Sequence, residues 1–176
     1  VERSRGLGDV YKRQDIIGIE LGGSIKNVIA LAAGVCDGLG LGDNTKAALI
    51  TRGITEIARL GVAMGGHMET FCGLSGIGDL IVTCTSTHSR NHNAGVLIGK
   101  GMSMDEAMKE VNQVVEGVYS AKAAFALAKK YNVSMPIVEQ INEVLFDGVS
   151  ATDAIQVLLT REECHEYQGL TWDADK

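Results

Sequence analysis

Two charged side chains of this sequence stand in apolar, glycine-rich stretches, where a charge is costly unless it has a partner. Lys26 and Asn27 interrupt a largely apolar segment, and Asp79 lies in a block with almost no other charge, with Thr83 one helical turn further on. Arg90 follows the next loop. A lysine in apolar surroundings can donate or accept a proton near neutral pH, and arginine offers a planar fork that fits phosphate. The set predicts a site that holds a small phosphorylated molecule while a proton moves at its carbonyl or hydroxyl group.

Each of these residues also has a purely structural explanation. A lone lysine on an apolar helix usually extends its ammonium group to solvent. A carboxylate that follows glycines, as Asp79 does, can cap a helix, and Arg90 could be a surface arginine after a loop. Ser89, Arg90 and Asn91 have the pattern of a helix start that can receive an anion at its first free N–H groups. The residues alone leave these alternatives open.

Three other patterns resemble functional motifs but do not match them. His88 and His92 have the spacing of one helix face, but no third ligand lies nearby, so we expect no metal site. Residues 95–101 resemble a phosphate-binding loop with one residue too few between the glycines and no Ser or Thr after the lysine. The glycines of residues 73–78 have the wrong order for a dinucleotide fingerprint, and no strand precedes them.

Composition narrows the class of protein. The net charge of −6 and the pI near 5.2 argue against a nucleic-acid-binding protein, and an anionic substrate must therefore be bound by a local cluster of positive groups. The longest apolar run, residues 28–36, is too short to span a bilayer, and the first residues do not resemble a signal peptide. We therefore expect a cytoplasmic protein without a transmembrane segment. The four dispersed cysteines are expected to be small buried side chains in a reducing compartment, namely Cys36, Cys72, Cys84 and Cys164.

The elements that must position these residues are helices. Apolar residues recur at steps of three and four from Gly23 onward, and no segment of useful length alternates as a strand would. Asn44 or Thr45 is expected to cap the second helix, Ser103 opens a capping box with Glu106, and a proline stands in the first turn of a later helix. The expected helices cover residues 23–39, 44–60, 77–84, 90–98, 104–111, 117–131, 136–145 and 152–163.

The domain boundaries follow from this pattern. We predict one all-α domain over residues 15–165 and a flexible tail over residues 166–176. Residues 1–14 have no helical or strand period, and we interpret them as non-native or disordered. The natural protein is then expected to continue upstream of Asp15.

With these residues in view, the chain resembles the C-terminal domain of the bacterial NAD(P)-dependent glycerol-3-phosphate dehydrogenase family. The similarity extends from about Asp15 to about Val149, and several separate blocks agree in order, which makes the signal specific. The matching blocks are residues 18–30, 38–53, 70–80, 89–91, 115–117 and 136–137.

The resemblance implies a fold, a reaction and a role for each site residue. The fold is a multi-helix substrate-binding domain of the 6-phosphogluconate-dehydrogenase C-terminal-like type. The reaction is reversible hydride transfer between dihydroxyacetone phosphate and glycerol 3-phosphate with NAD or NADP, and its product feeds glycerophospholipid synthesis. Lys26 would be the catalytic acid/base. The substrate-binding residues would be Lys26, Asn27, Asp79, Thr83, Ser89, Arg90 and Asn91, and the coenzyme would contact Arg90, Val114 and Glu116.

The family's N-terminal Rossmann half, which would bind most of the coenzyme, has no counterpart in this sequence. We therefore expect the chain alone to be inactive. A homodimer is a further possibility for its assembly. Two alternatives remain open: a related dehydrogenase that acts on another small hydroxy acid, and a non-catalytic helical interaction module.

Overall fold

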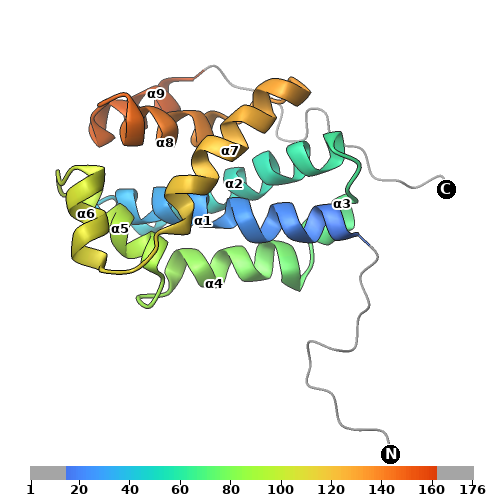
Figure 1. The fold of residues 1–176 in the computed structure, drawn as a ribbon, viewed down its shortest axis with the longest axis horizontal. Coiled ribbons are helices and arrows are strands. Elements are labelled where there is room, and N and C mark those ends of the chain that lie inside the picture. Colours follow the sequence, from blue (N-terminus) through green and yellow to red (C-terminus); the bar gives the residue numbers. More distant parts are fainter. Residues whose placement is uncertain (1–14, 162–176) are drawn as a thin grey trace, which may run out of the picture.

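The computed structural model describes residues 15–161 and shows a bundle of helices, with no strand in this part of the chain (Figure 1). The all-α prediction is confirmed. The elements are α1 (Ile16–Gly38), α2 (Asp43–Ala63), α3 (Met68–Phe71), the π-helix η2 (Leu74–Gly78), α4 (Asp79–Thr85), α5 (Arg90–Gly99), α6 (Met104–Val111), α7 (Glu116–Tyr131), α8 (Pro136–Phe146) and α9 (Ala151–Thr160). The predicted tail and the interpretation of residues 1–14 lie outside the described residues, as does the end of the last predicted helix.

The bundle is organised around α1. This helix crosses the middle of the molecule in Figure 1, and it packs against α2, α4, α5 and α7. Its residues from Val28 to Ala33 are almost completely buried. The α8–α9 pair covers one side of the bundle and contacts α7 and α5. The site residues on α1 therefore have a rigid support on all sides.

The N-terminal end of α1 is fixed by Asp15, which is buried. Its carboxylate accepts hydrogen bonds from the backbone N–H groups of Gly18 and His67, both at 2.8 Å, and from the Thr70 hydroxyl at 2.7 Å. Burial by itself would raise the pKa of the Asp15 carboxyl, but these hydrogen bonds outweigh it and lower the pKa below its ordinary value. The cap starts α1 directly after Asp15, whereas the sequence pattern predicted a helix only from Gly23 onward.

Other helix ends match local signals in the sequence. Ser103 forms the predicted capping box with Glu106, and Pro136 is the first residue of α8. The predicted cap of α2 was wrong: the helix begins at Asp43 after Gly42, and neither Asn44 nor Thr45 caps it. The short α3 and the π-helix η2 were not predicted.

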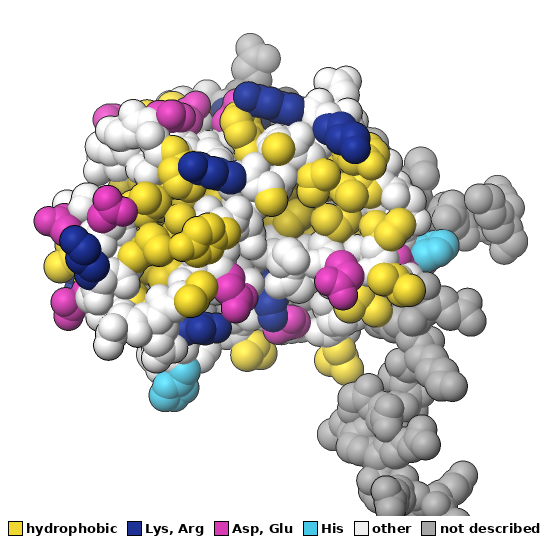
Figure 2. All heavy atoms as spheres, viewed as in Figure 1, with side chains coloured by type: hydrophobic (Ala, Val, Ile, Leu, Met, Phe, Trp, Pro, Cys, Tyr) yellow, Lys and Arg dark blue, Asp and Glu magenta, His cyan; other side chains and the backbone are white. Residues whose placement is uncertain are grey.

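The helix α1 is long and apolar enough to cross a membrane by length and composition, the one such helix among residues 15–161. In the structure, 61% of its most apolar 18-residue window is buried inside the bundle, which is the position of a core helix. The apolar part of this helix is therefore longer than the run over residues 28–36 identified from the sequence. On the face shown in Figure 2, Lys and Arg side chains alternate with Asp, Glu and apolar groups and do not form a broad basic area.

A buried carboxylate joins α2 to α8. Glu56 is only 1% exposed, and its side chain accepts hydrogen bonds from the backbone N–H of Ile137 at 2.9 and 3.1 Å and from that of Val138 at 3.4 Å. These N–H groups belong to the first turn of α8, which has no intrahelical acceptor for them. Burial raises the pKa of Glu56 to about 7, although the two N–H groups and nearby Arg59 act in the opposite direction.

This pKa predicts how stability depends on pH. In the unfolded chain Glu56 ionises near its ordinary pKa of 4.5, while in the folded chain it stays protonated until about pH 7. The contribution to stability is thus complete below pH 4.5 and declines as pH rises towards 7. The decline should be on the order of 3 kcal/mol, at about 1.4 kcal/mol per pKa unit.

Urea unfolding of the wild-type chain and Glu56→Gln at several pH values measures this effect. The difference in unfolding free energy between the two proteins isolates Glu56 from carboxylates such as Asp15, which act in the opposite direction. A difference that does not change between pH 4.5 and 7 would refute the prediction.

Candidate active site

Lys26 lies in the middle of α1, not near the start of the helix as predicted. Its ammonium group forms an ion pair with the carboxylate of Asp79, the first residue of α4. The two side chains retain 21% and 39% of their exposure, so the pair lies at the surface of the bundle and not in its core. The lysine therefore neither extends alone into solvent nor lies unpaired among apolar groups.

Asp79 does not act as the cap of α4. Gly78 occupies the cap position, and no side chain caps this helix end. Thr83 shares the helix face of Asp79, as predicted: its hydroxyl donates to the Asp79 carbonyl oxygen at 2.7 Å and lies 3.4 Å from a carboxylate oxygen. Thr83 and Lys26 therefore hold the Asp79 carboxylate from two sides.

A second set of contacts begins at Asn27, which is buried next to Lys26. The Asn91 side chain, at the start of α5, donates to Asn27 Oδ1 at 3.0 Å. The Asn91 Oδ1 in turn accepts a hydrogen bond of 2.8 Å from the backbone N–H of Gly117 in α7. A Cβ atom at Gly117 would lie 2.6 Å from the Asn27 carbonyl oxygen, so only glycine allows α7 to approach this closely. Three helices are joined at this point.

Glu116, the first residue of α7, connects this set to an arginine. It accepts a hydrogen bond of 3.1 Å from Asn27 Nδ2, and its other oxygen lies 3.4 Å from Nη2 of Arg90. The Arg90 and Glu116 side chains remain 42% and 55% exposed. Their charged groups are thus linked through Asn27 to the residue next to Lys26, and they remain accessible to a ligand.

The remaining predicted residues lie at the ends of these elements. Ser89 caps α5, as predicted, and its hydroxyl accepts from the backbone N–H of His92 at 3.3 Å. Val114 precedes α7 and is 60% exposed, while Val115 is buried. The structure therefore joins Lys26, Asp79 and Thr83 in one set of contacts and Asn27, Arg90, Asn91 and Glu116 in a second. The two sets meet at the neighbouring residues Lys26 and Asn27 and together form a cluster of residues from α1, α4, α5 and α7. Ser89 and Val114 lie beside this cluster, and neither side chain is hydrogen-bonded to its members.

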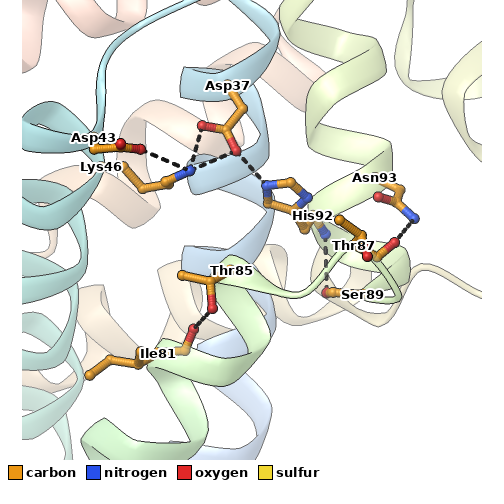
Figure 3. A network of polar contacts seen from close by, with 9 residues as sticks. All are labelled: Asp37, Asp43, Lys46, Ile81, Thr85, Thr87, Ser89, His92 and Asn93. Atoms are coloured by element: carbon orange, nitrogen blue, oxygen red, sulfur yellow. Dashed lines mark hydrogen bonds and ion pairs between the residues drawn. The ribbon is translucent and has the colours of Figure 1, made fainter.

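A neighbouring polar group was missed by the sequence reasoning. Asp37, near the end of α1, contacts Lys46 of α2 and His92 of α5 (Figure 3). Both partners are close in sequence to blocks already quoted, but nothing in their spacing links them to Asp37. Among residues 15–161, no group of three His, Cys, Asp or Glu side chains is placed to hold a metal ion.

Two of the cysteines are inert and one is exposed. Cys36 and Cys84 are buried, as predicted. Burial raises the pKa of the Cys36 thiol to about 11 and that of Cys84 to about 12, so neither is a reactive thiolate at neutral pH. Cys72 is exposed, contrary to the prediction, because it follows the short α3 at the surface. Cys164 lies outside the described residues.

Comparison with known proteins shows which family the chain belongs to. Residues 15–156 match the model of the NAD-dependent glycerol-3-phosphate dehydrogenase C-terminus. A glycerol-3-phosphate dehydrogenase [NAD(P)+] of Fusobacterium nucleatum is 63% identical over 160 residues, which are 91% of this chain and 48% of that protein. The Bacillus subtilis protein of the same name is 58% identical over 161 residues, 92% of this chain and 47% of that protein.

Solved structures agree with the sequence comparison. The glycerol-3-phosphate dehydrogenase of Coxiella burnetii superposes with a TM-score of 0.84 at 46% identity, over 86% of this chain and 46% of that one. The yeast enzyme superposes with a TM-score of 0.74 at 28% identity, over 82% of this chain and 42% of that one. The chain thus spans about half the length of the curated relatives it matches. It belongs to the NAD-dependent glycerol-3-phosphate dehydrogenase C-terminal family.

Proposed function

We propose that this chain is the substrate-binding and proton-transferring part of an oxidoreductase that interconverts dihydroxyacetone phosphate and sn-glycerol 3-phosphate with NAD or NADP. Its product would feed glycerophospholipid synthesis. The observations that support this most directly are the Lys26–Asp79 ion pair and the exposed Arg90–Glu116 pair, which is linked through Glu116 to Asn27, the neighbour of Lys26 in α1. These pairs would supply a proton donor and a phosphate-binding fork.

Lys26 is proposed as the acid/base residue at the reacting oxygen. In the reductive direction its ammonium group would donate a proton to the oxygen of the substrate carbonyl, and in the oxidative direction the neutral amine would accept it. Asp79 would orient the lysine, and the Thr83 hydroxyl would hold the carboxylate in place. Proximity and orientation of this kind are a large part of catalytic rate enhancement.

The phosphate end of the substrate is assigned to the start of α5. Arg90 supplies the charge, and the first N–H groups of the helix add hydrogen-bond donors at the positive end of the helix dipole. The Asn91 side chain is already committed to Asn27 and Gly117, so its contribution would come from its backbone N–H. Ser89 stabilises the same turn as its cap.

The coenzyme, when bound, supplies or accepts the hydride. The residues of this chain that would contact it are Arg90, Val114 and Glu116, whose side chains are exposed. An exposed apolar group beside two charged ones suits a ligand with an aromatic ring and polar substituents. The remainder of the coenzyme would be bound by an N-terminal half like that of the longer relatives.

The cellular setting and assembly are also proposals. The three cysteines of the described part of the chain are free, which fits a reducing compartment such as the cytoplasm. The homodimer stays a prediction, which sedimentation velocity of the full-length protein would test.

The test is a fusion in which residues from Asp15 onward replace the matching half of the Fusobacterium nucleatum relative. This full-length fusion should reduce dihydroxyacetone phosphate with NADH or NADPH, and the 176-residue chain alone should not. A panel of small hydroxy acids distinguishes the first alternative, since preference for an unphosphorylated acid would refute the proposed substrate. A folded fusion without any dehydrogenase activity would favour the interaction-module alternative.

Replacement of Arg90 by lysine tests the phosphate assignment. Both side chains are cationic, but only arginine presents two parallel donors to two phosphate oxygens. We expect Arg90→Lys to lower kcat/KM for glycerol 3-phosphate by about tenfold, and Arg90→Ala to lower it further. Activity on unphosphorylated dihydroxyacetone should hardly change. Equal losses on both substrates would show that Arg90 shapes the site in a way unrelated to phosphate.

A further inference from the structure

The contact between α1 and α5 includes glycines on both helices. Gly34 on α1 and Gly95 and Gly99 on α5 face the partner backbone, and a Cβ atom at Gly34 would collide with the carbonyl oxygen of His92. Glycine surfaces allow close approach, but they lack the ridges that interlock in ordinary helix packing. The glycines therefore set how closely α5 approaches α1, and directional contacts near the helix start would fix its rotation and its position along α1.

The structure shows two such contacts on adjacent residues of α5. Asn91 is bonded to Asn27 in the middle of α1. His92, whose side chain is 10% exposed, is bonded through Nε2 to Asp37 Oδ2 at 2.8 Å, near the end of α1. Successive residues of a helix point in directions about 100° apart, so the two contacts restrain rotation as well as sliding.

The Asp37 end of this contact is itself held firmly. Lys46 of α2 donates to both Asp37 carboxylate oxygens, at 2.9 and 3.0 Å, and Figure 3 shows the three side chains converging between α1, α2 and α5. Burial alone would raise the pKa of Asp37, but the bonds from Lys46 and His92 outweigh it and lower the pKa. The acceptor for His92 is thus an ionised carboxylate, and such hydrogen bonds are stronger than neutral ones.

The second ring nitrogen of His92 argues for a directional role. Nδ1 is buried and has no hydrogen-bond partner among the described residues. A buried polar atom without a hydrogen-bond partner costs about 1–3 kcal/mol. An apolar ring of similar size would avoid that cost, so the imidazole contributes mainly through the one bond that it makes to Asp37.

We propose that Asp37, Lys46 and His92 are positioning residues that hold the start of α5, and with it Ser89, Arg90 and Asn91, in the geometry that receives the substrate phosphate. The proposal deepens the proposed function and rests on it for the identity of the ligand. None of the three touches the reacting atoms. They would act by fixing the helix whose first turn binds the anion.

The first test uses the 176-residue chain and needs no activity. The backbone N–H of Gly117 is bonded to Asn91, so its amide hydrogen exchange reports on the position of the α5 start. In His92→Phe we expect this amide to exchange about tenfold faster, while that of Ile137, bonded to Glu56, is unchanged. His92→Gln keeps a donor near the position of Nε2 and should restore slow exchange. Equal acceleration at both amides, or none at Gly117, would overturn the proposal.

The second test uses the full-length fusion. His92→Phe should raise KM for the phosphorylated substrate about tenfold with kcat changed less than twofold, because the fold and Lys26 stay intact while the anion site is displaced. His92→Gln should recover most of the loss, and His67→Phe, at an exposed histidine before α3, should have no effect. A lower kcat at unchanged KM would indicate a loss of folded enzyme and contradict positioning. If the wild-type fusion is folded but inactive, the proposed function fails, whereas the exchange measurement still decides whether His92 positions α5.

Discussion

Replacement of Lys26 by alanine in the full-length fusion should reduce kcat by about 10²–10⁴, the usual contribution of a positioned proton donor. The loss should appear in kcat and kcat/KM together, because the proton is transferred only in the transition state. The protein should still fold. Asp79, left without its partner, is 39% exposed and can be hydrated, and α1 keeps all of its buried apolar contacts.

The design of this experiment separates catalysis from folding and from net charge. Lys109→Ala removes an exposed positive charge from α6 and should leave the rate unchanged. A small primary amine added to the Lys26→Ala protein should restore part of the rate, since it can occupy the space of the lost ammonium group. Circular dichroism and thermal unfolding would confirm the fold. A folded Lys26→Ala enzyme with near wild-type kcat would overturn the assignment of Lys26 as the acid/base residue.

The parts of the fold that could be predicted from the sequence are those decided by neighbours along the chain. The capping box of Ser103, the cap of α5 at Ser89 and the first-turn proline of α8 each depend on residues within one helical turn. The start of α1 has a local cap as well, from Asp15 to the N–H of Gly18, which the sequence pattern did not reveal, and its other contacts could not be predicted in this way. Asp15 holds it through His67 and Thr70, which are more than fifty positions away.

The site shows the same limit. Residue types indicated that Lys26 and Asp79 need partners, but spacing could not show that they are partners of each other across 53 positions. The same is true of Asn27 and Asn91, which are 64 positions apart. Their grouping was predicted from the family resemblance, and the structure places them together. The contact of His92 with Asp37 carried no local signal, so it became visible only when α5 was seen lying on α1.

Replacement of Gly95 by alanine should be among the most destabilising single-methyl changes in the bundle core. α5 lies directly on α1, and a Cβ atom at Gly95 would collide with the carbonyl oxygen of Leu31 and lie 2.9 Å from the Val35 nitrogen and 3.0 Å from the Gly34 Cα. All three are backbone atoms of the central helix, so none can move aside as a flexible side chain would. Inserting a methyl group here should cost about 3 kcal/mol, more than the helix propensity gained from alanine.

Gly23→Ala is the matched control, because it lies on the same central helix and its Cβ would meet nothing within 4 Å. That change should stabilise the chain by about 0.5–1 kcal/mol, the ordinary difference between alanine and glycine inside a helix. Urea unfolding of the 176-residue chain measures both changes, because the slope and midpoint of each variant's unfolding curve give its free energy of unfolding. Because α5 carries Ser89, Arg90 and Asn91, a fusion with Gly95→Ala that still folds should also bind the phosphorylated substrate more weakly. If Gly95→Ala proved as stable as Gly23→Ala, the close crossing of α1 and α5 would not be the constraint that places the anion-binding turn.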